Sequence, residues 1–165
     1  MPTHKHLPHL TRIWISNPIY YITTCTHQRK PILANDNVAQ ILIEEWSNAL
    51  ENHGWMVGCY VIMPDHVHFF CSFSDKLADC NKKDLSSFMQ QWKQWTSKRI
   101  LRDTHDNRTK LLPPIWQKEY FDHLLRSEES YNQKWEYVRQ NPVRKNLVQK
   151  ADDWRWQGEI YDLTM

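Results

Sequence analysis

Glycine is scarce in this chain, with three residues in 165. Neither GxGxxG nor GxxxxGK[ST] occurs, which argues against the glycine-rich loops that cradle phosphates in nucleotide-binding folds. The cysteines never have CxxC spacing, so neither a zinc knuckle nor a thioredoxin-type motif is expected; they are Cys25, Cys59, Cys71 and Cys80. No apolar run reaches 18 residues and no N-terminal signal pattern is visible, so we expect a cytoplasmic protein with reduced thiols and no membrane partner.

Aromatic residues are abundant instead: the chain holds nine Trp, seven Tyr and five Phe. The net charge is only +2, but residues 91–150 contain 13 Lys and Arg against 7 Asp and Glu. A basic, ring-rich segment is typical of proteins that bind a polyanion with stackable bases. The same pattern also suits a solvated helical surface, so charge alone leaves both interpretations open.

The order of hydrophobic patterns predicts an α+β protein. Alternating or β-branched runs predict strands at 19–27, 55–63 and 66–73, and residues 115–125 could hold a fourth strand. Helical periodicity predicts three helices, at 38–54, 84–103 and 126–142, the last of them stopped at Pro142. The order β-α-β-β-α-β-α is the ferredoxin-like (RRM-like) plan, an antiparallel sheet with helices on one face, plus a C-terminal helix. We expect one domain, 1–165, with a loosely held N-terminal arm (1–18) and a C-terminal tail (150–165).

The stretch MPDHVHFF, residues 63–70, places two histidines one residue apart in a predicted strand. Alternate residues of a strand point to the same face, so His66 and His68 share one side while Val67 and Phe69 take the other. Imidazoles spaced in this way can bind one divalent cation. Asp65 could orient one ring as a hydrogen-bond partner, or could simply be the turn residue that follows Pro64.

The predicted helix at 126–142 has two distinct faces. Tyr131, Trp135 and Val138 form the stripe expected to pack on the core, whereas Ser130, Lys134, Tyr137 and Asn141 form a second stripe. Tyrosine can act as a nucleophile that forms a covalent intermediate, and an asparagine carbonyl is a suitable ligand for a hard metal. Lys134 could offset phosphate or phenolate charge. A half-exposed surface tyrosine would fit the same pattern.

Taken together, the motifs resemble those of one family. PDHVHFF resembles the His-hydrophobic-His (HUH) motif, and YVRQN, with Tyr137 and Asn141, resembles the tyrosine helix that follows it. WQKEYFDHLLR (116–126), NPVRKNLV (141–148) and DWRW (153–156) complete the set. The sequence resembles the single-tyrosine HUH transposases, most closely the REP-associated tyrosine transposases, over roughly residues 15–158. HIT-type hydrolases would need a histidine at Phe70, and zinc deaminases would need HxE and PCxxC, which do not occur.

The resemblance implies a function and a site. It implies a transposase-type enzyme of DNA recombination that cleaves single-stranded DNA beside a REP-like hairpin, giving a 5′-phosphotyrosine and a free 3′-hydroxyl. Tyr137 would be the nucleophile, with Tyr120 as its rival. His66, His68 and Asn141 would hold the metal, and Asp65 and Lys134 would support the site. Mg²⁺ or Mn²⁺ fits these ligands, although ligand type alone does not rule out zinc. Candidates for contacts with the DNA backbone are Lys98, Arg99, Arg102, Arg108, Lys110, Arg144 and Lys145.

Two other functions remain open at this stage. One is a non-catalytic hairpin-binding protein on the same fold, and the other is a metal-dependent phosphoesterase of small nucleotides with water as the nucleophile. No small-molecule cofactor is expected. A monomer is favoured, although related insertion-sequence enzymes act as dimers that exchange the tyrosine helix.

Overall fold

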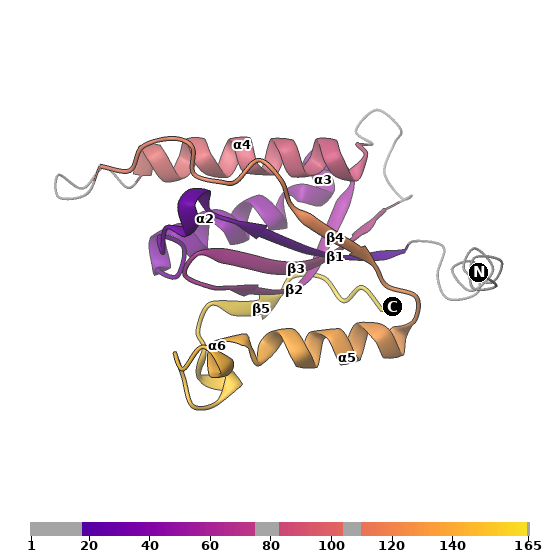
Figure 1. The fold of residues 1–165 in the computed structure, drawn as a ribbon. Helices are drawn as coiled ribbons and strands as arrows, with labels where there is room; N and C mark the ends of the chain where they lie inside the picture. The colour runs from indigo at the N-terminus through magenta and orange to yellow at the C-terminus, as the bar shows by residue number, and fades with distance from the viewer. Residues whose placement is uncertain (1–17, 75–82, 104–109, 165) are drawn as a thin grey trace.

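The computed structural model describes residues 18–74, 83–103 and 110–164, and it centres on one antiparallel sheet (Figure 1). The strands lie in the order β4-β1-β3-β2-β5. Their bounds are β1 Ile19–Cys25, β2 Trp55–Ile62, β3 His66–Phe73, β4 Phe121–Leu124 and β5 Gln157–Glu159. The predicted α+β class and antiparallel sheet are confirmed, and the first four strands follow the βαββαβ order of the ferredoxin-like plan.

Helices cover both faces of the sheet (Figure 1). One side carries α2 (Asp36–Ser47), α3 (Ala49–His53) and α4 (Leu85–Asp103), and the other carries α5 (Glu128–Arg139) and α6 (Asn141–Arg144). Two short 3₁₀ helices, η2 (His27–Arg29) and η4 (Ala151–Asp153), complete the set. The sheet therefore has the predicted helices on one face, and the helix that carries Tyr137 covers the opposite face. No described helix is both long and apolar enough to span a bilayer.

The central strand β3 explains why both faces need cover. Val67, Phe69 and Cys71 belong to the hydrophobic cluster under α2 and α4. Phe70 points the other way, into a second cluster with Tyr131 and Val138 of α5. A strand that is apolar on both sides is stable only when both sides are covered. The two histidines have the same parity as Phe70 and therefore lie on the α5 side.

Several predicted boundaries were wrong for identifiable reasons. The helix predicted at 38–54 is broken at Asn48 into α2 and α3, and Gly54 then ends it in the left-handed conformation, with φ 80°. The third helix ends at Arg139, not at Pro142. Pro142 lies in the first turn of α6, where its missing N–H has no helical partner to lose.

The predicted C-terminal tail, 150–165, packs against the sheet over much of its length. Gln157–Glu159 form β5, which pairs with β2, and Trp154 is buried with its indole N–H donating to the carbonyl of Ile62. Within 115–125 only Phe121–Leu124 form a strand, and Trp116 makes an isolated bridge to Thr26. The predicted N-terminal arm lies outside the described residues, apart from its last residue.

Candidate active site

The two histidines of β3 meet on the sheet face that α5 covers. Their Nε2 atoms are 3.1 Å apart and their rings are inclined at 81° to each other. Both residues are buried, with exposed fractions of 7% for His66 and 8% for His68. The prediction that they share one face is confirmed. They do not form an exposed polar face; their ring nitrogens converge on a common, buried point.

Asp65 orients the ring of His66. The Nδ1 atom of His66 is 2.7 Å from Oδ1 of Asp65, and the other carboxylate oxygen accepts a 2.9 Å bond from Nε of Arg29. Because a carboxylate only accepts, His66 donates through Nδ1–H and presents an unprotonated Nε2 to the site. The predicted role of Asp65 as an orienting partner agrees with this geometry. Arg29 was not identified from the sequence.

His68 is held by two hydroxyl groups from β1. Its Nδ1 atom is 2.8 Å from both the Tyr21 hydroxyl and Oγ1 of Thr23. The ring of Tyr21 also stacks on His68, with 5.6 Å between centroids. Neither residue was predicted from the sequence to be part of the site. Because they alternate in β1, Tyr21 and Thr23 share one face of the sheet. That they face His68 follows only from the register of β1 against β3.

Asn141 connects the helical layer to the histidine pair. Its Nδ2 atom is 2.7 Å from Nε2 of His68, and its Oδ1 accepts a 3.1 Å bond from Arg144. Arginine can only donate, so the amide oxygen faces Arg144 and the amide NH₂ donates to His68. His68 is therefore unprotonated at Nε2 and carries its proton on Nδ1.

The two unprotonated Nε2 atoms therefore lie 3.1 Å apart with no proton between them, and Asn141 donates to one of them. A cation at that point would relieve the repulsion, and two donors at right angles on an ion with bonds of about 2.1 Å lie about 3 Å apart. Among the described residues, no group of three His, Cys, Asp or Glu side chains is placed to hold a metal. The third protein donor available here is the Asn141 amide, which would turn its oxygen inward and release Arg144.

Burial keeps both imidazoles neutral. It lowers the pKa of His66, although the neighbouring Asp65 opposes the shift. It lowers the pKa of His68 to about 3, with the positive charges of Lys134 and Arg144 adding to the effect. Burial alone would raise the pKa of Asp65, but hydrogen bonds from His66 and Arg29 outweigh it and hold that pKa below its usual value. Neutral imidazoles beside an ionised carboxylate are the protonation states that metal ligation requires.

Tyr137 lies one helical turn before Asn141, at the rim of the site. It is 61% exposed, and the Arg144 guanidinium covers its ring at 4.0 Å from the centroid. Lys134 lies 5.9 Å from the same centroid and 4.7 Å from that of Tyr21. The predicted packing stripe is confirmed, with Tyr131 and Val138 buried. The second stripe therefore places a phenol beside two cations, four residues before the amide that contacts His68.

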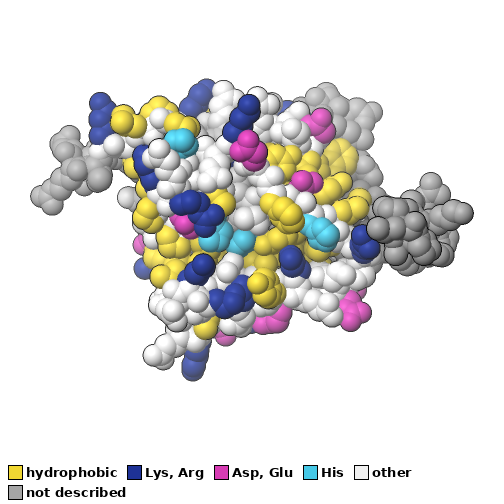
Figure 2. Space-filling view, in the orientation of Figure 1, with side chains coloured by type: hydrophobic (Ala, Val, Ile, Leu, Met, Phe, Trp, Pro, Cys, Tyr) yellow, Lys and Arg dark blue, Asp and Glu magenta, His cyan; other side chains and the backbone are white. Residues whose placement is uncertain are grey.

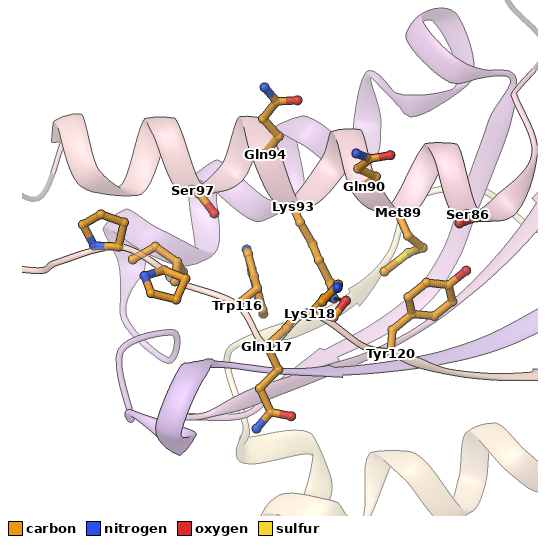
Figure 3. Close-up of a pocket in the computed structure, with 13 residues that line it drawn as sticks. Ser86, Met89, Gln90, Lys93, Gln94, Ser97, Trp116, Gln117, Lys118 and Tyr120 are labelled. Atoms are coloured by element: carbon orange, nitrogen blue, oxygen red, sulfur yellow. Dashed lines mark hydrogen bonds between the residues drawn. The ribbon is translucent and has the colours of Figure 1, made fainter.

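The rival tyrosine, Tyr120, lies elsewhere. It lines a cavity of about 480 Å³ between α4 and the segment 113–120 (Figure 3). Lys93 points from α4 into this region, donates to the carbonyls of Gln117, Lys118 and Glu119, and lies 5.6 Å from the Tyr120 ring centroid. Burial lowers the pKa of Lys93 to about 8. The structure does not bring Tyr120 to the histidine pair.

The predicted DNA-contact residues fall into separate groups. Arg144 touches Tyr137 and Asn141, and the charge of Lys145 helps to lower the pKa of His66, so these two lie at the site. Figure 2 shows histidine side chains near the centre of one face with Lys and Arg side chains around them. The remaining residues lie elsewhere: Lys98 over Trp95, Arg99 bound to Glu44 and Glu45, Arg102 paired with Asp103, Lys110 exposed, and Arg108 outside the described residues.

Comparisons with known proteins agree with this fold. The REP-associated tyrosine transposase of Escherichia coli strain K12 is 21% identical over 147 residues, covering 87% of this chain and 77% of the relative. A solved structure of a REP-associated tyrosine transposase bound to a REP hairpin matches with a TM-score of 0.64, at 17% identity and 92% coverage of both chains. A crystal structure of a candidate transposase from Deinococcus radiodurans matches with a TM-score of 0.53, at 18% identity, covering 76% of this chain and 91% of that one.

A family model matches most of this chain and shows the family to which it belongs. The model of the family described as "Transposase IS200 like" matches residues 15–141, a range that includes both histidines, Tyr137 and Asn141. The resemblance to REP-associated tyrosine transposases seen in the sequence motifs is thereby confirmed. The chain belongs to the family of IS200-like transposases.

Proposed function

We propose that this protein is a single-tyrosine HUH enzyme that nicks and rejoins single-stranded DNA beside a hairpin. The observation that carries the proposal is the 2.7 Å contact between Asn141 and His68. It ties the segment that bears Tyr137 to the histidine pair within one chain. A phenol, a pair of unprotonated imidazoles and two cations are thus gathered at one surface, which is the set that phosphoryl transfer to tyrosine requires.

The donor set suits a divalent cation. His66, His68 and the oxygen of Asn141 would hold Mg²⁺ or Mn²⁺, with Asp65 fixing the tautomer of His66. When bound, such an ion supplies Lewis-acid stabilisation of the negative charge that develops on a phosphate oxygen. Three protein donors leave coordination positions open for the substrate.

Tyr137 is the nucleophile in this proposal. Its phenolic oxygen forms a bond to phosphorus while the bond from phosphorus to the sugar 3′-oxygen breaks, so the 5′-phosphate becomes attached to the protein. The phenolic proton passes to water, because the side chain is 61% exposed. The departing 3′-oxygen takes a proton from water and becomes a hydroxyl. Arg144 and Lys134 lie 4.0 and 5.9 Å from the centre of the phenol ring, where they stabilise the phenolate and the phosphate charge.

The proposed substrate is single-stranded DNA next to a hairpin, because a phosphate in a flexible strand can align with a fixed tyrosine. The likeness to a transposase bound to a REP hairpin supports this substrate class. The reaction conserves the phosphodiester energy, so attack by a 3′-hydroxyl on the phosphotyrosine rejoins strands. Action as a single subunit is part of the proposal, since Asn141 can contact His68 of its own chain.

The direct test is capture of the covalent intermediate. Hairpin DNAs with single-stranded flanks of randomised sequence, labelled at the 3′ end, are incubated with protein and Mn²⁺ and separated on a denaturing gel. Since the 5′ end of the downstream fragment joins the tyrosine, the 3′ label should migrate with the protein. Wild type and Tyr120→Phe should give this band, and Tyr137→Phe should not.

The same gel separates the alternatives. Hairpin binding without any adduct in the wild type, in Mg²⁺ or in Mn²⁺, would indicate a non-catalytic hairpin-binding protein. DNA cleavage that survives in Tyr137→Phe would indicate water as the nucleophile. A band that disappears in Tyr120→Phe and persists in Tyr137→Phe would reassign the nucleophile.

A further inference from the structure

An aromatic ring stands exposed beside the candidate active site. Phe121, the first residue of β4, is 57% exposed although β4 is paired in the sheet. The neighbouring His123 is also exposed. An exposed ring is unremarkable singly, so its meaning depends on what lies around it.

The strand register places Phe121 on the face of the histidine pair. Phe121 lies directly opposite Thr23 of β1, and Thr23 is opposite His68 of β3. Cross-strand partners share one face, and two strand spacings amount to about 10 Å. The ring of Phe121 also meets that of Tyr21 edge-on, at 6.3 Å between centroids, and Tyr21 bonds to His68. One ring therefore separates Phe121 from the site.

The surroundings of Phe121 are basic on this side. His123, Lys134 and Tyr137 line a hollow of about 250 Å³ between β4 and α5. Lys134 lies over Tyr21, the ring that Phe121 contacts. Asp122 is opposite Ile22, which belongs to the core under α2 and α4, so its carboxylate lies on the other face of the sheet. A polyanion lying across this surface meets the Lys134 ammonium and aromatic rings.

The chain segment that leads into Phe121 is held in place by hydrogen bonds. Lys93 donates to the backbone carbonyls of Gln117, Lys118 and Glu119, in the segment that leads into β4 (Figure 3). Trp116, at the start of this segment, is buried and bonds through its indole N–H to Thr96. The ring is therefore presented from an ordered segment, which lowers the entropic cost of using it in binding.

We propose that Phe121 is a stacking platform for a nucleobase of the DNA strand whose phosphate lies at the His66–His68 pair. This inference rests on the proposed function, since it extends the same substrate across the surface. A base one nucleotide from that phosphate reaches the ring, and the hollow lined by His123 and Lys134 takes the adjoining backbone. A single exposed ring suits a base, whereas a protein partner would need a far larger apolar surface.

The test distinguishes contacts with the DNA bases from contacts with the DNA backbone. The probes are fluorescein-labelled d(T)₁₂ and an abasic dodecamer with the same phosphates, with binding followed by anisotropy in Mn²⁺. The parent is Tyr137→Phe, which keeps the ring but lacks the nucleophile. Adding Phe121→Ala or Phe121→Leu should weaken binding of d(T)₁₂ by about 5- to 100-fold, and leave binding of the abasic probe within about twofold. Phe121→Trp should retain the preference for d(T)₁₂.

The matched control is Trp95→Ala, which removes a half-exposed aromatic ring from α4 on the other side of the sheet. It should change the binding of neither probe. Unchanged d(T)₁₂ binding in Phe121→Ala, or equal losses of affinity for both probes, would overturn the proposal that a base stacks on Phe121. The proposed function has a separate readout, which is formation of the covalent adduct by the wild-type chain. That result does not depend on whether Phe121 contributes to DNA binding.

Discussion

Asn141 and His68 are 73 positions apart in sequence, yet the amide nitrogen of one lies 2.7 Å from Nε2 of the other. This bond crosses from the helical layer to the central strand of the sheet. Arg144 donates a second hydrogen bond to the amide oxygen of Asn141, and because arginine can only donate, this bond fixes which end of the amide faces the imidazole. The Asn141 amide therefore ties the tyrosine segment to the histidine pair, in addition to the packing of Tyr131 and Val138 on the sheet.

Asn141→Ala is expected to lower both metal affinity and stability. It removes the oxygen donor and one buried hydrogen bond, so we expect weaker Mn²⁺ binding and a loss of about 1 kcal/mol in the free energy of unfolding. Mn²⁺ titration followed by electron paramagnetic resonance and urea denaturation measure the two effects. Asn132→Ala, at an exposed asparagine of the preceding helix α5, is the control. Mn²⁺ affinity that is equal in the two variants would exclude Asn141 as a ligand.

Arg144→Lys should slow adduct formation without unfolding the protein. Arg144 donates to the backbone carbonyl of Tyr137 at 2.9 Å and to Asn141, and it covers the phenol ring. Lysine cannot make this planar set of contacts, so we expect the rate of adduct formation to fall by about 10-fold or more. Arg126→Lys, at an exposed position before α5, serves as the control. Equal rates for the two variants would show that a positive charge alone suffices.

The parts of the site that could be predicted from sequence are those set by local geometry. His66 and His68 share a face because a strand alternates, and Tyr137 and Asn141 neighbour each other because four residues make about one helical turn. Asp65 was identified because it is adjacent to His66 in sequence. None of these predictions needed knowledge of how separate elements meet.

The parts that were missed depend on contacts between distant elements. Thr23 and Tyr21 reach His68 only through the register of β1 against β3, and Arg29 reaches Asp65 across a turn. The strand β5 is three residues long and has no alternation to detect. Its existence depends on the unpaired edge of β2, which the sequence of 157–159 does not reveal.

Asp65→Asn should weaken metal binding through His66 without removing a ligand. The carboxylate accepts from Nδ1–H of His66 at 2.7 Å and so fixes Nε2 as the free donor atom. Loss of such a partner typically costs 10- to 100-fold in metal affinity, and we expect about that decrease for Mn²⁺. Asp122→Asn, an exposed carboxylate on the other sheet face, should leave affinity unchanged. A change below about twofold in Asp65→Asn would mean that Asp65 acts only on the turn.

His53 should make the fold sensitive to acid. It is buried at the end of α3, where burial and the nearby Lys83 lower its pKa to about 4. An unfolded histidine has a pKa of about 6.5, so between these values the unfolded chain binds a proton that the folded chain does not. The free energy of unfolding should therefore fall as the pH drops from about 6.5 to about 4, by about 1.4 kcal/mol per pH unit from this residue. Urea denaturation across that range should give a flatter profile for His53→Gln than for the wild type, and parallel profiles would show that folding does not shift the pKa of His53.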